Sequence, residues 1–188
     1  MEQVWRDWGG VLLAALAGLP LLVLLTAGLA RLRRDVPAGQ AWRRSVAEVG
    51  AVAGTLPWVW MILTPRDAPR QVDPVPLRDL ADLLTGAPVT AVVQVVGNLL
   101  VFAALGFFGP VRLAALAGTG RLFLLGAVGS VLVETLQYAL DLGRVSSMDD
   151  VLLNATGAAL AGLLSRRWWA RPAAAPAGPA AVPTTRRG

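Results

Sequence analysis

The sequence contains no cysteine, no histidine and no lysine. Without cysteine it can form no disulfide and offers no thiol nucleophile. Without histidine it lacks the base of Ser-His-Asp and Cys-His catalysis and a common zinc ligand. Without lysine it lacks the Ser-Lys dyad, the Schiff-base amine and the P-loop lysine. Any reaction must therefore use carboxylates, amides, hydroxyls and arginine, and we expect no cofactor and no bound metal.

Charge is scarce as well, whereas apolar residues are abundant. Only 15% of the residues are charged, 55% are hydrophobic, and the mean hydropathy is +0.59. An ordinary soluble domain is ~45–50% apolar even when glycine is counted. All 17 basic residues are arginines, and they stand in short clusters between apolar segments. Such clusters are typical of membrane flanks, so we expect a membrane protein and no nucleic-acid partner.

Five apolar segments approach the ~20 residues that a helix needs to cross a bilayer. They are residues 9–30, 45–63, 90–109, 121–140 and 149–165. The sequence therefore predicts an all-α fold, a polytopic transmembrane bundle of about five spans, in a multi-pass membrane protein.

The chain divides into four predicted regions. Residues 1–63 form two N-terminal helices with an arginine-rich cytoplasmic loop, and residues 64–89 form an extracytoplasmic loop with a short amphipathic helix at 77–84. Residues 90–165 form a three-helix core, and residues 166–188 form a disordered cytoplasmic tail. Arginine placement sets the orientation, since cytoplasmic loops are enriched in arginine. With the N-terminus outside and the C-terminus in the cytoplasm, twelve of the 17 arginines are cytoplasmic and five are outside.

This topology brings polar residues of three spans to one level below the outer surface. A helix rises ~1.5 Å per residue, so the third, fourth and fifth spans place polar groups at similar depth. Helical periodicity also puts polar and small residues on the inward face of each span and leucines on the opposite face. The candidate pocket comprises Gln94, Asn98, Glu134, Gln137, Arg144, Asp149, Asp150 and Asn154.

Each of these residues also has a structural interpretation. Ser147 followed by acids fits a capping box at the start of the fifth span, which would explain at least one member of the Asp149–Asp150 pair. The amides could simply form hydrogen bonds between helices. Glu48, beside the arginines at 43 and 44, is expected to be structural. Glu134 lies in an apolar stretch and is expected to pair with Arg144 or to share a proton with an aspartate.

The residues from 90 to 165 resemble the VanZ-like family of bacterial membrane proteins. The segment GNLLVFAALGFFGP matches its first motif through Asn98, Phe102, Gly106 and Phe107. The segment ETLQYALDLGRVSSMDDVLLNATG matches the E-x-x-Q, R, DD, N and G series that follows. Ala104 stands where the family usually has proline, so a helix kink there would be absent or displaced. The resemblance implies a multi-pass protein of the bacterial cell membrane that is linked to the cell envelope and connected with teicoplanin (glycopeptide) resistance.

Three functions are compatible with the residues. The first, which we favour, is a non-enzymatic protein that binds membrane lipids, a lipid-linked cell-wall precursor or a glycopeptide, with Arg144 gripping a phosphate. The second is a membrane-embedded transferase or hydrolase that uses carboxylates as general acid and base, with or without a divalent cation at Glu134 and the aspartate pair. The third is a small transporter or an accessory subunit, and the lack of an inverted repeat argues against a self-contained transporter.

Overall fold

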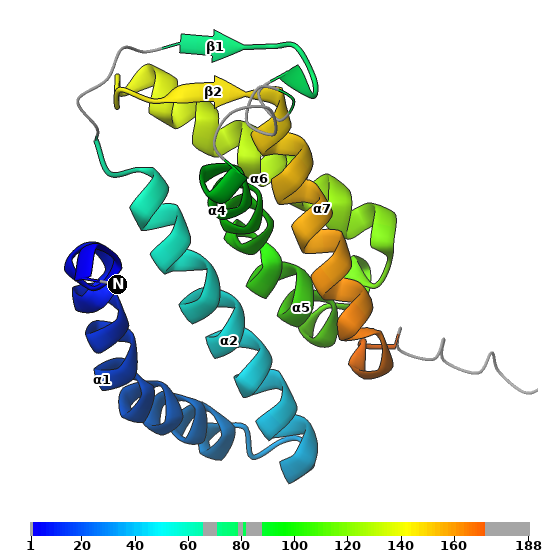
Figure 1. Ribbon diagram of the computed structural model, residues 1–188. Helices are drawn as coiled ribbons and strands as arrows, with labels where there is room; N and C mark the ends of the chain where they lie inside the picture. Colours follow the sequence, from blue (N-terminus) through cyan, green and yellow to red (C-terminus); the bar gives the residue numbers. More distant parts are fainter. Residues whose placement is uncertain (1, 66–70, 79–80, 82–87, 172–188) are drawn as a thin grey trace, which may run out of the picture.

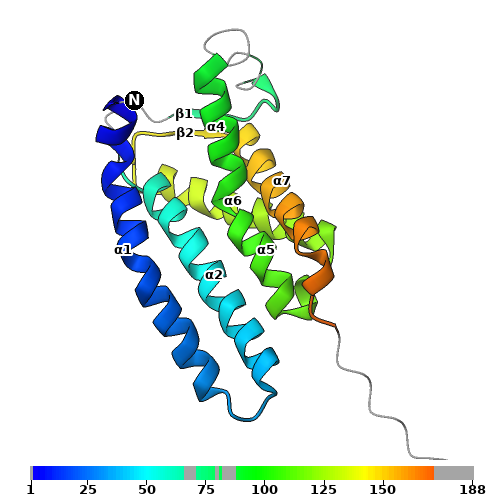
Figure 2. The same cartoon turned by 60° about the horizontal axis from the view of Figure 1, so that its bottom comes forward.

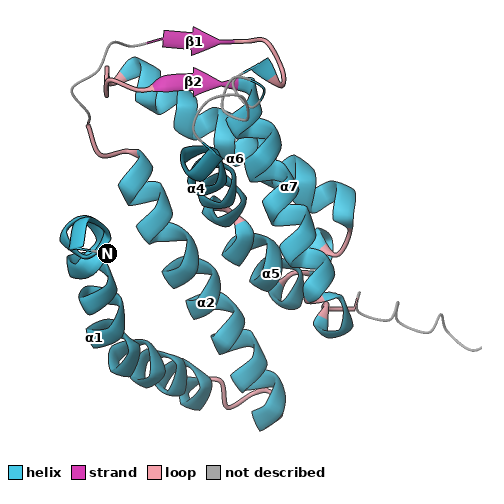
Figure 3. Cartoon of the chain, in the orientation of Figure 1, coloured by secondary structure: helices cyan, strands magenta, loops and turns pink. Residues whose placement is uncertain are grey.

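The computed structural model describes residues 2–65, 71–78, 81 and 88–171, and within them the chain is almost entirely helical (Figures 1 and 3). The α-helices are α1 (Glu2–Leu32), α2 (Ala38–Ile62), α4 (Pro88–Val101), α5 (Ala103–Arg112), α6 (Thr119–Ala139) and α7 (Met148–Leu164). Two three-residue strands, β1 (Gln71–Asp73) and β2 (Val145–Ser147), and the 3-10 turns η1 (Ala114–Leu116) and η2 (Arg166–Trp168) complete the described chain. The predicted all-α class is confirmed.

Three helical segments are long and apolar enough to cross a membrane. They are Ala38–Ile62, the joined α4–α5 segment Val89–Arg112, and Thr119–Ala139. The C-terminal part of α1, Leu16–Leu32, is a shorter apolar helix. Large aliphatic side chains on these helices point outward, and Leu132, for example, is 59% exposed. Such a surface suits lipid, in which apolar side chains need no covering.

The third predicted span, 90–109, is not one continuous helix. It breaks at Phe102, where φ is −109° and ψ is 10°, between α4 and α5. The Phe102 ring is buried with Val101, Val133 and Ala158 in the core of the bundle. The break therefore lies two residues before Ala104 and needs no proline, because packing of the ring holds the bend.

Helix α7 is the centre of the bundle and packs against α4, α5 and α6. Glycines allow this contact. A Cβ atom on Gly157 would lie 2.0 Å from the backbone oxygen of Leu99 in α4, and one on Gly106 would lie 2.1 Å from the backbone oxygen of Ala158. A Cβ on Gly126 of α6 would lie 2.8 Å from the Cα of Ala155. Small residues thus bring three helix backbones into direct contact with α7, as in other membrane bundles.

The two ends of the bundle differ in character (Figures 1 and 2). At one end, which we call the sheet end, β1 and β2 form a parallel pair in which Val72 stands opposite Ser146. The C-terminus of α2 and the N-termini of α4 and α7 lie at this end. The sequence did not predict this strand pair. Most of the amphipathic helix expected at 77–84 lies outside the described residues.

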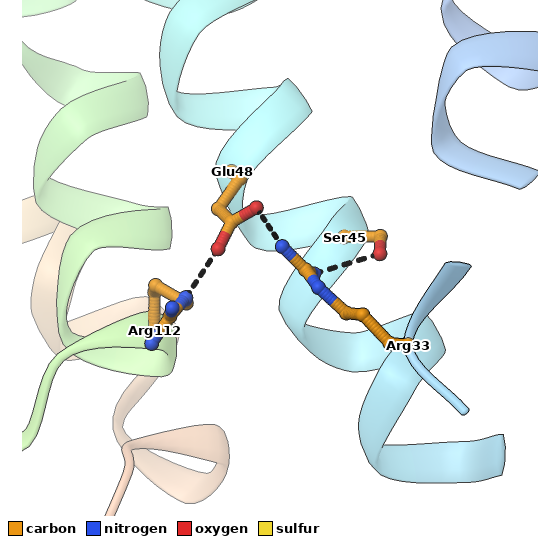
Figure 4. A network of polar contacts seen from close by, with 4 residues as sticks. All are labelled: Arg33, Ser45, Glu48 and Arg112. Carbon is orange, nitrogen blue, oxygen red and sulfur yellow. Dashed lines mark hydrogen bonds and ion pairs between the residues drawn. The ribbon is translucent and has the colours of Figure 1, made fainter. Parts of the chain in front are cut away.

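The opposite end, the arginine end, carries the α1–α2 turn and the C-termini of α5 and α7. Here the Glu48 carboxylate on α2 forms ion pairs with Arg33, which follows α1, and with Arg112 at the end of α5 (Figure 4). Arg33 also donates a hydrogen bond of 2.8 Å to Ser45. Glu48 thus joins three elements, although its partners are not the arginines next to it in sequence.

The first residues of the segment predicted as a tail (166–188) contact the bundle. After η2, the Trp169 Nε1 donates to the Gly162 carbonyl and to Ser165 Oγ, both at 3.1 Å. The Ala170 amide donates to the Pro110 carbonyl at 2.8 Å. These bonds fold residues 166–170 back onto α5 and α7. Residues 172–188 lie outside the described chain.

Candidate functional site

The first link between the predicted site residues joins α4 to α7. Asn98 on α4 donates a hydrogen bond from Nδ2 to the Asp150 carboxylate, in the first turn of α7. Both side chains are half-buried. The link depends on the close approach of the two helices at Gly157, about two turns below Asp150 on the same stripe. Two residues 52 positions apart in sequence are thus brought together, as the topology predicted.

The second link joins α7 to α6. Asn154 donates from Nδ2 to Ser130 Oγ at 2.7 Å, and Ser130 Oγ donates a longer bond of 3.4 Å to Glu134 Oε1. Asn154 is only 4% exposed, and its Oδ1 has no hydrogen-bond partner among the described residues. An unsatisfied buried acceptor is uncommon and costs ~1–3 kcal/mol in the absence of a donor.

We call the residues of these two links the sheet-end cluster: Asn98, Ser130, Glu134, Asp150 and Asn154. Glu134 and Asp150 also interact electrostatically with each other. Ser130 stands on the predicted polar stripe of the fourth span but was missing from the predicted site. Its spacing of four residues from Glu134 was the signal that could have identified it.

Asp149, the neighbour of Asp150, is tied to the chain segment outside the helices. Its side chain is 3% exposed and accepts a hydrogen bond from the Leu77 backbone amide. Leu77 has a φ of 65°, a conformation that is rare for leucine. The Asp149 amide in turn donates to Ser147 Oγ at 3.2 Å, so Ser147 caps α7 as predicted. Asp149 therefore fastens the segment after β1 onto the start of α7.

Gln137 and Arg144 both bind the C-terminal end of α2. Gln137 Nε2 donates to the Ile62 carbonyl at 2.7 Å. Arg144 Nη2 donates to the carbonyls of Met61 at 2.8 Å and Thr64 at 3.1 Å. The last carbonyls of a helix lack intrahelical donors and carry partial negative charge, so both side chains act as a C-terminal cap.

The expected pairing of Glu134 with Arg144 is therefore not the arrangement found. The described bonds of Arg144 lead to α2, whereas Glu134 accepts from Ser130 and faces the charge of Asp150. The other expectation was a proton shared with an aspartate, and Asp150 is the aspartate whose charge Glu134 faces. Gln94 is half-buried one turn before Asn98 on α4, and within the described chain no hydrogen bond involves its side chain.

The cluster contains carboxylates but no evident metal site. Among residues 2–65, 71–78, 81 and 88–171, no three acidic side chains converge closely enough to share a metal ion. What the cluster offers instead is a set of amides, a hydroxyl and two interacting carboxylates between three packed helices. That set can accept and donate hydrogen bonds to a polar group presented at the surface of a membrane.

Long apolar helices, outward-facing leucines and a polar cluster held between helices define a helical membrane protein. The VanZ/LLP1 family model matches residues 51–169, and the chain belongs to this family. The match begins within α2 and ends at Trp169, so α1 and the first half of α2 precede it. No curated protein and no solved structure matches the chain.

Proposed function

We propose that this protein is a multi-pass protein of the bacterial cell membrane that binds the headgroup of a lipid or lipid-linked cell-wall component at the sheet-end cluster. The observation that carries the proposal is the convergence of polar side chains from α4, α6 and α7 in otherwise apolar helices. A charged residue within a membrane costs at least ~2.5–3.5 kcal/mol, so such a cluster is rarely kept without a use.

The charge distribution supports placing the sheet end outside the cell. Arginines gather at the arginine end, on the α1–α2 turn, at the end of α5 and around η2. An excess of arginine marks the cytoplasmic side. The cluster then faces the outer leaflet, where lipid-linked cell-wall intermediates and glycopeptides are found.

Membership of the VanZ/LLP1 family supports a role in glycopeptide susceptibility, and we propose that binding at the cluster alters the response to teicoplanin. The test is expression of the full chain in a teicoplanin-susceptible bacterium, with Asn98→Ala and Asp150→Asn as cluster variants. Asp141→Asn is the matched control, since Asp141 is an exposed acid at the same end in a left-handed conformation that asparagine tolerates.

The wild-type chain and the control should raise the inhibitory concentration of teicoplanin, and the cluster variants should not. Equal amounts of each protein must be present in the membrane fraction. If the wild-type chain reaches the membrane without changing susceptibility, the glycopeptide part of the proposal is wrong. Lipid binding is tested separately, by native mass spectrometry of the purified chain, which should retain lipid that the cluster variants lose.

A second candidate function is a carboxylate-dependent transferase or hydrolase that acts on an envelope lipid. The electrostatic interaction of Glu134 with Asp150 favours it, because an acid and a base of different proton affinity can arise from two neighbouring carboxylates. Chemical conversion of an added envelope lipid by the wild-type chain, lost in Glu134→Gln, would establish this function. Binding without conversion favours the first proposal.

A further inference from the structure

The arginine end carries more positive charge than its ion pairs use. Arg33 and Arg112 share the Glu48 carboxylate, with one guanidinium on each oxygen (Figure 4). Arg44 lies one turn before Glu48 on the same face of α2, is half-buried, and makes no hydrogen bond or ion pair within the described chain. The other acid described at this end, Asp35, is exposed on the α1–α2 turn. Three positive charges beside the single negative charge of Glu48 leave an excess of two at this point.

Arg112 is held in place but keeps most of its donors. Glu48 accepts a hydrogen bond only from its Nε. A guanidinium has five N–H donors in one plane, so the four on the Nη atoms of Arg112 have no acceptor within the described chain. The side chain is 36% exposed, which leaves it within reach of a ligand. Since the ion pair already fixes the guanidinium, a ligand need not order it on binding.

Two simpler roles leave part of this arrangement unexplained. Joining α1, α2 and α5 needs Arg33 and the Nε of Arg112 only. Orienting the chain in a membrane depends on how many arginines flank a span, whether or not they are buried. A half-buried arginine without a partner loses hydration and gains nothing in return. Arg44 and the Nη atoms of Arg112 therefore have the character of an anion site.

The position of the two arginines favours an amphiphilic anion. Arg112 is the last residue of the apolar segment Val89–Arg112, and Arg44 directly precedes the apolar part of α2. Both therefore lie where the apolar surface of the bundle ends. Leu32 and Leu113, the neighbours of Arg33 and Arg112 in sequence, are exposed. A phosphate that carries acyl chains can use the arginines and this apolar surface together, whereas a free phosphate ion uses the arginines alone.

We propose that Arg44 and Arg112 bind the phosphate of an anionic phospholipid, at a site that Glu48 holds in place and that is separate from the sheet-end cluster. Each guanidinium can donate two parallel hydrogen bonds to phosphate oxygens. The excess of positive charge selects a headgroup without a cation of its own, such as that of phosphatidylglycerol. The quaternary ammonium of phosphatidylcholine would meet like charge here.

The test uses the purified full chain in an uncharged detergent and phosphatidylglycerol with a fluorophore on an acyl chain, so that the headgroup is unaltered. Binding is followed by fluorescence anisotropy. The unlabelled competitors are phosphatidylglycerol, phosphatidylcholine and glycerophosphoglycerol, which is the same anionic headgroup without acyl chains. The first two compare an anionic with a zwitterionic lipid, and the third separates a lipid from a soluble phosphate.

We expect phosphatidylglycerol to compete at least roughly tenfold better than phosphatidylcholine, and the soluble headgroup not to compete in the same range. Arg44→Gln and Arg112→Gln should each weaken binding of the labelled lipid at least about fivefold, which is the usual contribution of one arginine near anionic lipid. Arg78→Gln is the matched control, because it removes an exposed arginine at the sheet end and should leave binding unchanged.

Tryptophan-fluorescence melting shows whether each variant folds. Arg44 makes no described bond, so Arg44→Gln should melt like the wild-type chain and decides the question if Arg112→Gln does not fold. Equal competition by the two phospholipids, or an equal loss of binding in Arg78→Gln, would refute the site. Competition by the soluble headgroup as strong as by the lipid would refute a lipid as its ligand. Loss of binding in Asn98→Ala, with binding retained in both arginine variants, would place the lipid at the sheet-end cluster and overturn the inference while supporting the proposed function.

Discussion

Replacing Gly157 by alanine should separate the two helices that hold the sheet-end cluster. The added Cβ would lie 2.0 Å from the Leu99 oxygen, 2.6 Å from its carbonyl carbon and 2.7 Å from its Cα. All three are backbone atoms, so no side chain can rotate away. Because real Cβ atoms essentially never approach closer than 3.0 Å, α4 and α7 must move apart by about 1 Å.

Overpacking of a well-packed interior typically costs ~1–3 kcal/mol. For a chain of this size, each kcal/mol lowers the midpoint of thermal unfolding by ~2–4 °C. We therefore expect Gly157→Ala to melt roughly 2–12 °C below the wild-type chain. The hydrogen bond from Asn98 to Asp150 spans the same helix pair and should be lost with the contact.

The assay is thermal unfolding of the detergent-solubilised chain, followed by the fluorescence of its seven tryptophans. The matched control is Gly97→Ala on α4, where a Cβ would meet nothing within 4 Å. That substitution should leave the melting temperature unchanged or raise it, since alanine favours a helix by up to ~1 kcal/mol over glycine. If Gly157→Ala melts as high as Gly97→Ala, the close packing of α4 on α7 is wrong.

Three further predictions use the same melting assay. Phe102→Ala should lower the free energy of unfolding by ~3–5 kcal/mol, because it leaves a cavity at the α4–α5 break. Phe123→Ala, at an exposed site, should have little effect. Equal losses of stability in the two variants would contradict the burial of the Phe102 ring at the break. Ser147→Ala should cost ~1 kcal/mol by removing the cap of α7, and an unchanged melting temperature would count against that cap. Glu48→Ala leaves two arginines unpaired and should lower the free energy of unfolding by ~1 kcal/mol or less, since the ion pairs are partly exposed. Asp35→Ala removes an exposed acid at the same end and should leave the free energy of unfolding unchanged. A larger loss for Asp35→Ala than for Glu48→Ala would refute the role of Glu48.

The positions of the helices could be predicted because apolar length and arginine flanks are local properties of the sequence. The predicted start at 121 and the observed start of α6 at Thr119 differ by two residues. Helical periodicity and the alternation of direction also sufficed to bring Asn98, Asp150 and Asn154 together. These residues lie on inward stripes whose depth follows from counting residues from the helix ends.

The features that escaped prediction depend on contacts with backbone atoms, which a pattern of side chains does not reveal. Arg144 binds the end of α2 through carbonyl groups that every residue possesses. The strand pair β1–β2 is only three residues long and joins segments about 70 positions apart. The break at Phe102 depends on how its ring packs in the core formed with α6 and α7, and nothing in the local sequence marks it.

The central claim, that the cluster is a polar site open to the outside of the cell, can be tested directly because the chain has no cysteine. Glu134→Cys and Leu132→Cys place a thiol on the same helix, the first in the cluster and the second on the outward apolar face. Intact cells are treated with a membrane-impermeant maleimide. We predict modification of Glu134→Cys and none of Leu132→Cys. Modification of Glu134→Cys only after the cells are opened, or equal modification of both, would contradict the claim.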